Sequence, residues 1–404
     1  LSNMSMQNTI MKTIVCASTG LLATLVISTA TAGVEEQAKR IHDRIAGVPP
    51  TAEELTLLVN EINTNGARDA ALKVSLENKN FYNVTLKNMY TPWTNEAQTV
   101  FAPLNDFTAT MIGIIRDGLD FRTVLYDDIV YTGIDGADGL PAYSNDNNEH
   151  YAALESQNVD LSDLSKFASA SQSAFNGLPA NATSGVLTTR AAAKAFFVAG
   201  TNRAMFRFTT LNFLCNDMEQ LKDTTRPTDR IRQDVTRSPG GDSRIFMNAC
   251  MGCHSGMDPM AQAYAYYEWS GEEGSEDGHI EFTDGTVQPK YFINENNFPY
   301  GYVTPDDRWT NYWREGPNGW VGWDESLADK GSGNGAKGMN QELAHSDAFA
   351  QCQVKKVFST VCLRDPTTAS DLTQMESFVT RFTGTHNYKL KEVFADTAEY
   401  CMGE

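Results

Sequence analysis

The chain has 404 residues, of which 41% are hydrophobic and 10% aromatic, so it encodes a globular protein rather than a disordered one. Its 32 Lys and Arg residues stand against 51 Asp and Glu residues, which gives a net charge of −19. This charge argues against nucleic acids and anionic membrane surfaces as partners. The length suits one large domain or two ordinary ones.

The first 32 residues have the pattern of an export signal. A basic start at Met11 precedes an apolar run over residues 14–27, and a small-residue cleavage site ends at Ala32. We therefore predict that residues 1–32 are a signal peptide with a few upstream residues, and that the protein is exported to a bacterial periplasm. An uncleaved N-terminal anchor is the alternative. No later segment is apolar for long enough to span a membrane.

Helical patterns follow the signal. Thr51 and Glu54 form a capping box at the start of an apolar stripe that runs from Leu55 to Ile62. The same periodicity predicts three more helices, over residues 161–175, 189–198 and 205–214.

A polar segment divides the chain. Residues 222–243 contain several Pro and Gly residues, which is typical of a linker. We therefore predict a helical N-terminal domain at residues 33–235 and a second domain at residues 236–404. The second domain should begin with a helix from about Asp242 to Trp269. An irregular Trp- and Gly-rich insertion follows over residues 270–335, and two helices close the chain, around residues 349–361 and 372–382.

The second domain contains a Cys-x-x-Cys-His string, from Cys250 to His254. This string is the signature of covalent c-type haem attachment. Positions i, i+3 and i+4 share one helix face, so a single turn presents two thiols to the haem vinyl groups and an imidazole to the iron. We predict that Cys250 and Cys253 hold one haem c and that His254 is the proximal ligand of its iron.

Two other interpretations of the string are less favoured. A thioredoxin-like redox pair would follow a strand, whereas Ile245, Phe246 and Ala249 form a helical pattern before Cys250. A structural zinc site would need two more ligands, usually as a second close pair, and no second Cys-x-x-Cys exists.

The ligand on the far side of the iron decides the chemistry, because a six-coordinate haem transfers electrons and an open one can bind peroxide or oxygen. Met257 and Met260 follow His254 on the proximal helix and are badly placed to reach around the haem. Met339 follows a Gly-rich segment and precedes a C-terminal helix, as the distal methionine of small cytochromes c does. We predict Met339 as the second iron ligand, with His345 or an open site as alternatives.

Four cysteines remain after the signal and the motif, and in an oxidising compartment they can form two disulfides. Cys352 and Cys362 lie on one predicted helix, about 15 Å apart, whereas a disulfide tolerates about 7 Å between Cα atoms. We therefore disfavour that pair and expect Cys215 and Cys401 each to bond one of the two helix cysteines. Free buried thiols are the alternative.

The motif, followed by Met257-Asp258-Pro259, resembles the haem block of planctomycete-type cytochrome c-domain proteins. Three other segments look like parts of that family in the same order, namely Gly185–Thr189, Asn202–Arg207 and Phe349–Cys352. The resemblance implies an exported protein with covalent haem c, but no substrate. One departure is Met260, where the family often has glycine. The predicted fold is mainly α, a helical N-terminal domain followed by a cytochrome c-like haem domain.

Three functions remain open. The first is an electron-transfer protein that serves an unknown redox protein or membrane electron-transfer complex. The second is a haem enzyme of peroxidase or oxygenase type with an open distal site. The third is a partner-binding or carbohydrate-associated module with an accessory haem, for which the tryptophans of residues 309–323 would supply stacking surfaces.

Overall fold

The fold is seen in a computed structural model, which describes residues 32–134, 139–198, 200–272 and 274–403. The predicted signal peptide therefore lies outside the described residues, apart from Ala32. The described chain is mainly helical, as the sequence predicts. Within it, no helix combines the length and the apolar character that crossing a membrane requires.

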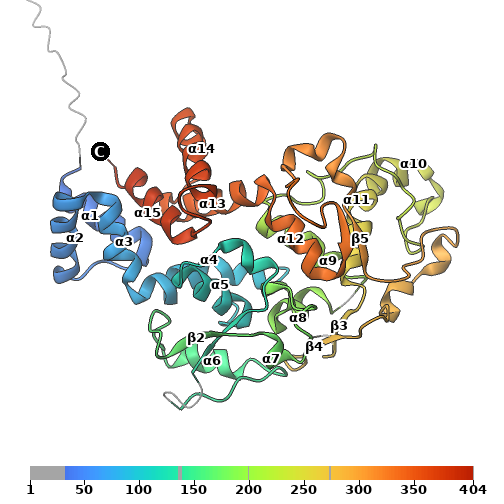
Figure 1. The fold of residues 1–404 in the computed structure, drawn as a ribbon, viewed down its shortest axis with the longest axis horizontal. Coiled ribbons are helices and arrows are strands. Elements are labelled where there is room, and N and C mark those ends of the chain that lie inside the picture. The colour runs from blue at the N-terminus through green and yellow to red at the C-terminus, as the bar shows by residue number, and fades with distance from the viewer. Residues whose placement is uncertain (1–31, 135–138, 199, 273, 404) are drawn as a thin grey trace, which may run out of the picture.

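The α-helices are distributed along the described part of the chain (Figure 1). Their bounds are α1 Val34–Ala46, α2 Ala52–Asn65, α3 Ala67–Lys73, α4 Lys87–Tyr90, α5 Asp106–Arg116, α6 Glu149–Ser156, α7 Ser173–Asn176, α8 Arg190–Phe196, α9 Arg203–Phe213, α10 Ser243–Ile245, α11 Met251–Ala261, α12 Gly335–Ala344, α13 Asp347–Cys362, α14 Ala369–Thr383 and α15 Leu390–Cys401. Two π-helical turns are η2 Phe81–Leu86 and η8 Phe246–Cys250. The 3-10 helices are η1 Ser75–Glu77, η3 Thr91–Thr94, η4 Phe121–Leu125, η6 Gly185–Thr188, η7 Pro239–Gly241, η9 Gln262–Tyr264, η10 Pro289–Phe292, η11 Glu295–Asn297, η12 Tyr312–Arg314 and η13 Pro317–Val321.

The strands form three small antiparallel pairs. They are β1 Val130–Gly133 with β2 Phe167–Ala170, β3 Tyr267–Trp269 with β4 Ile280–Phe282, and β5 Arg308–Thr310 with β6 Ser332–Asn334. Their registers place Val130 opposite Ala170, Tyr267 opposite Phe282 and Trp309 opposite Gly333. None of these pairs is long enough to form a layer, so helices supply most of the core.

Several predicted helices are confirmed. The capping box of Thr51 and Glu54 is present at the start of α2, with each side chain bonded to the backbone of the other residue. Helix α8 begins after Thr189, whose hydroxyl caps it, and α9 covers most of the stripe predicted at residues 205–214. These starts depend on local hydrogen bonds and local periodicity, which the sequence contains.

Three predicted elements are wrong in type, extent or number. The helix predicted over residues 161–175 is replaced by β2 and the short helix α7, because Phe167 is fully buried in pairing with β1. The helix predicted to reach Trp269 ends at Tyr264, and the next residues pair with β4 as strand β3. Three helices rather than two close the chain, since α15 follows α14. In the first two cases strand pairing overrides the helical spacing.

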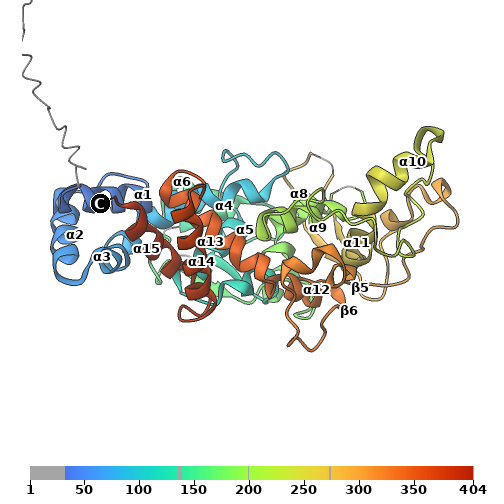
Figure 2. The same ribbon diagram turned by 90° about the horizontal axis from the view of Figure 1, so that it is seen from above.

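Helices α1 and α15, the first and last of the described residues, lie side by side, as Figures 1 and 2 show. Helix α15 packs against α1 and α3, and α13 packs against α15. Arg68 on α3 donates a hydrogen bond of 2.6 Å from Nε to the buried Asp396 on α15. The main hydrophobic core runs from Ala38 to Ala398 and therefore crosses the boundary predicted between residues 235 and 236.

Two disulfides join helices within this arrangement. Cys215, which follows α9, is bonded to Cys352 on α13, with their Cα atoms 5.3 Å apart. Cys362 at the end of α13 is bonded to Cys401 at the end of α15, with a Cα separation of 5.4 Å. The prediction that Cys352 and Cys362 do not pair with each other is confirmed, and each takes one of the two other cysteines.

Candidate functional site

The Cys-x-x-Cys-His string lies at the start of α11. Cys250 is the last residue of the π-helical turn η8, and Cys253 and His254 lie in the first turn of α11. At about 100° per residue, these three positions project from one face of the helix. All three are partly exposed, and the His254 side chain is 20% accessible. The helix therefore presents two thiols and an imidazole together at the protein surface.

The opposite face of α11 is held against the protein through two glycines. A Cβ added at Gly256 would lie 2.0 Å from Nε1 of Trp313, and one added at Gly252 would lie 2.6 Å from Cγ of Lys222. Trp313 is only 1% exposed and is part of the main core. Glycine is therefore required at both positions for this close approach, which fixes the rotation of α11 and directs the motif outward.

The two motif cysteines are free thiols, whereas the other four described cysteines form disulfides. Sγ of Cys253 lies 3.5 Å from the carbonyl oxygen of Met218, to which the thiol donates. Burial and the nearby Glu219 carboxylate raise the pKa of Cys253. A raised pKa is the reverse of what a reactive dithiol needs, since the thiolate is the nucleophile in disulfide exchange. A helical turn also precedes the motif, where a thioredoxin-like site would have a strand.

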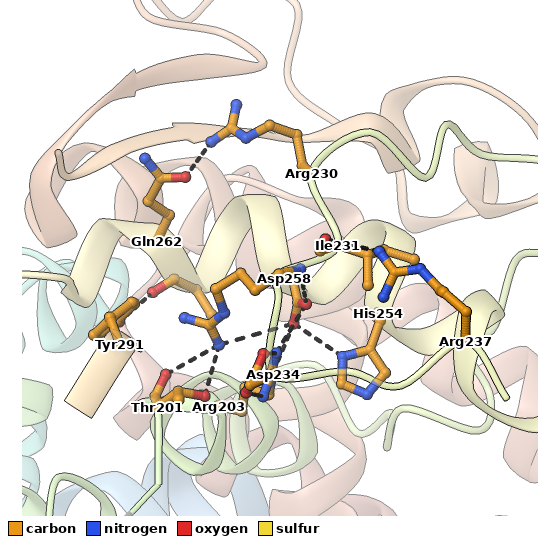
Figure 3. A network of polar contacts seen from close by, with 12 residues as sticks. Thr201, Arg203, Arg230, Ile231, Asp234, Arg237, His254, Asp258, Gln262 and Tyr291 are labelled. Carbon is orange, nitrogen blue, oxygen red and sulfur yellow. Dashed lines mark hydrogen bonds and ion pairs between the residues drawn. The ribbon is translucent and has the colours of Figure 1, made fainter. Parts of the chain in front are cut away.

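His254 is oriented by a carboxylate one turn further along α11. Its Nδ1 is 3.1 Å from Oδ1 of Asp258, and Asp258 is fully buried (Figure 3). Because a carboxylate can only accept, the Nδ1 proton of His254 is the donor. Among the described residues, no group bonds Nε2 of His254. The imidazole is therefore held through one nitrogen and presents the other one outward.

Two arginines hold Asp258, the partly exposed Arg203 and the buried Arg232. Arg203 donates from Nε and Nη2 at 2.7 and 2.9 Å, and its other bonds go to Asp234. The backbone N–H of Arg232 donates at 3.3 Å, and its guanidinium lies 3.9 Å from the carboxylate. Burial by itself would raise the pKa of Asp258, but Arg203, His254 and Arg232 outweigh it and hold the pKa well below its usual range. Asp258 is therefore anionic.

Met339 lies on a different helix from the motif. It is fully buried in the main core, on α12, and α12 packs against η9. The next residue, Asn340, accepts a hydrogen bond of 3.0 Å from the hydroxyl of Tyr264 at the end of η9. Tyr264 follows His254 by about 15 Å along a helix axis. No contact brings Met339 to His254 in the described residues, and its role as iron ligand stays a prediction.

His345, the alternative distal ligand, is bound elsewhere. Its Nδ1–H donates to the carbonyl oxygen of Gln341 at 2.9 Å, and its ring stacks on Tyr126 with the ring centroids 5.6 Å apart. Tyr126 follows η4 in the N-terminal half of the chain. Both candidate distal residues therefore have their own packing partners, distinct from the His254 network.

Three of the four tryptophans of the insertion are core residues. Trp309 and Trp313 are each 1% exposed and Trp323 is 9% exposed. Trp309 packs against Gly333 and Gly338, which lie in β6 and the first turn of α12. Only Trp320 is exposed, at 52%. Core packing therefore explains these tryptophans better than carbohydrate stacking does.

Sequence reasoning identified the motif but not the residues that support it. The spacing of His254 and Asp258 at i and i+4 on a helix was a usable signal, because such residues face each other. Arg203 and Asp234 had no comparable signal, because they come close to the His254–Asp258 pair only through tertiary packing.

Among the described residues, no group of three or more His, Cys, Asp and Glu side chains is placed to hold a metal ion.

Comparisons of the chain with family models, curated proteins and solved structures found no match.

Proposed function

We propose that this protein is an exported c-type cytochrome that transfers electrons to or from a redox partner. One haem would be attached covalently through Cys250 and Cys253, with His254 as the proximal ligand of its iron. The cytochrome c-like haem domain at residues 236–404 and the periplasmic location belong to the same proposal. The partner would be a redox protein or a membrane electron-transfer complex.

One observation carries this proposal. The only free cysteines of the described chain are the two whose spacing matches haem attachment, and they share a helix face with a histidine whose Nε2 has no protein partner there. All three side chains are partly exposed, so a haem can reach them. The two disulfides support export, because disulfides persist outside reducing compartments.

A bound haem c would supply a one-electron iron couple. The chain's own contribution is to hold and orient it. The two thiols fix the edge of the ring on α11, and the close packing at Gly252 and Gly256 fixes the rotation of that helix. His254 presents Nε2, while its Nδ1–H donates a hydrogen bond to Asp258. This division of the two ring nitrogens is common in histidines that ligate metals.

Covalent attachment is the test. The chain is produced with the export and c-type haem maturation machinery, denatured, and separated by electrophoresis with staining for haem. We expect haem to remain with the wild-type polypeptide and to be lost when Cys250 and Cys253 are both replaced with alanine. Replacing Cys215 with serine is the matched control, because it removes a disulfide cysteine and leaves the motif intact. Wild-type protein without covalent haem contradicts the proposal.

A haem enzyme with an open distal site is the second candidate. It is favoured by the packing of Met339 in the core near η9 and of His345 on Tyr126. The oxidised spectrum separates the two. A low-spin spectrum that becomes high-spin in Met339→Ala supports electron transfer with Met339 as ligand. A high-spin wild-type spectrum, unchanged in that variant and altered at once by cyanide, supports the enzyme.

A further inference from the structure

Asp258 is placed to do more than stabilise α11. Its side chain is fully buried, and its two oxygens accept from His254, from Arg203 and from the backbone of Arg232. A carboxylate inside a protein needs compensation, and the arginines supply it. The bond to His254 connects this network to the motif, and the side chains of His254 and Arg203 are each 20% accessible.

The network holds the carboxylate in one position. Arg203 is held between Asp258 and Asp234 by four hydrogen bonds (Figure 3). The side chain of Asp234 is only 8% exposed. Together with Arg232, the network contains two arginines and two aspartates, so their charges balance. Oδ1 of Asp258 accepts from Nε of Arg203 and from Nδ1–H of His254, and Oδ2 accepts from Nη2 of Arg203 and from the backbone N–H of Arg232. The bidentate contact of Arg203 also fixes the orientation of the Asp258 carboxylate, since a guanidinium binds carboxylates in a planar fork.

A carboxylate that accepts a hydrogen bond from the Nδ1–H of an imidazole makes Nε2 a stronger electron-pair donor to a metal. A stronger donor stabilises ferric iron over ferrous iron, because the ferric ion carries more charge. We propose that Asp258 is a positioning residue that orients His254 and lowers the reduction potential of the haem. This inference rests on the proposed function. It adds that the reduction potential of the haem depends on the Asp258–His254 pair, which Arg203 holds in place.

The test compares two charge-neutralising variants of the holoprotein, Asp258→Asn and Asp234→Asn. Both remove a carboxylate from Arg203, but only the first removes the anionic acceptor of His254. The reduction potential is measured by optical titration against redox mediators. We expect Asp258→Asn to favour the ferrous state at least tenfold, which is about 59 mV for one electron. Asp234→Asn should shift the potential in the same direction by less than a third of that amount.

Equal shifts in the two variants, or no shift in Asp258→Asn, overturn the inference. Haem staining of denatured protein is done on the same samples, so a failure of the inference is distinguished from a failure of haem attachment. If Asp258→Asn does not yield folded holoprotein, Asp258→Glu replaces it. The added methylene displaces the carboxylate from Nδ1 while keeping its charge, and we expect a changed potential. A wild-type potential in Asp258→Glu also overturns the inference.

Discussion

Replacing Gly256 with alanine should destabilise the protein by about 3 kcal/mol, because the new methyl group would enter the indole ring of Trp313. The added Cβ would lie 2.0 Å from Nε1 and 2.1 Å from Cε2 of that ring. Nonbonded carbon atoms normally stay about 3.5 Å apart, so the ring must move by more than about 1 Å. Trp313 is 1% exposed in the main core, which leaves no free space for this movement.

The magnitude follows from three terms. Overpacking a close-packed core costs about 1–3 kcal/mol. Replacing a buried tryptophan with alanine costs about 3–5 kcal/mol, and a tryptophan that is displaced from its site loses part of that stabilisation. Alanine returns about 1 kcal/mol through its higher helix propensity at Gly256. The balance of about 3 kcal/mol is a large part of the about 5–15 kcal/mol that stabilises an ordinary domain.

Urea unfolding, followed by circular dichroism, measures this cost. Gly319→Ala is the control, because a Cβ there meets no atom within 4 Å, and its midpoint should stay close to the wild-type value. Trp313→Leu makes room for the new methyl group. The double variant Gly256→Ala/Trp313→Leu should therefore be more stable than the sum of the two single changes predicts. A wild-type midpoint for Gly256→Ala, or strict additivity in the double variant, would refute the packing argument.

Burial, and then the nearby Lys355, lower the pKa of Lys356 from 10.5 to about 8. This shift means that protonated Lys356 destabilises the folded protein by about 3 kcal/mol. The cation–π contact with Trp93 returns about 1 kcal/mol. The unfolded chain binds this proton more tightly, so the penalty is complete below pH 8 and disappears as the pH rises toward 10.5. Lys356→Met should raise the free energy of unfolding by about 2 kcal/mol at pH 7, as measured by urea unfolding, and this increase should disappear at higher pH. An equal increase in Lys355→Met would contradict the argument. Replacing Cys362 and Cys401 with serine should cost about 4 kcal/mol, because their bond closes a separation of 39 residues; an unchanged urea midpoint would refute that.

The sequence determined what depends on neighbours along the chain. The Cys250–His254 spacing places its three side chains on one helix face, and the structure has a helix there. The capping box at Thr51 and the separation of Cys352 from Cys362 on one helix are local in the same sense. Short-range hydrogen bonds and the helix period fix such features, so they could be predicted without knowledge of the rest of the fold.

Tertiary structure decided the features that join distant segments. Strand pairing converted Tyr267–Trp269 from a predicted helix into β3, and the packing of α15 on α3 carried the core across the predicted domain boundary. Arg203 meets Asp258 from a different helix, and that contact fixes the proton of His254. These pairings depend on burial and shape complementarity between surfaces far apart in sequence. Composition and periodicity record which residues are apolar or charged, but not which of them come together.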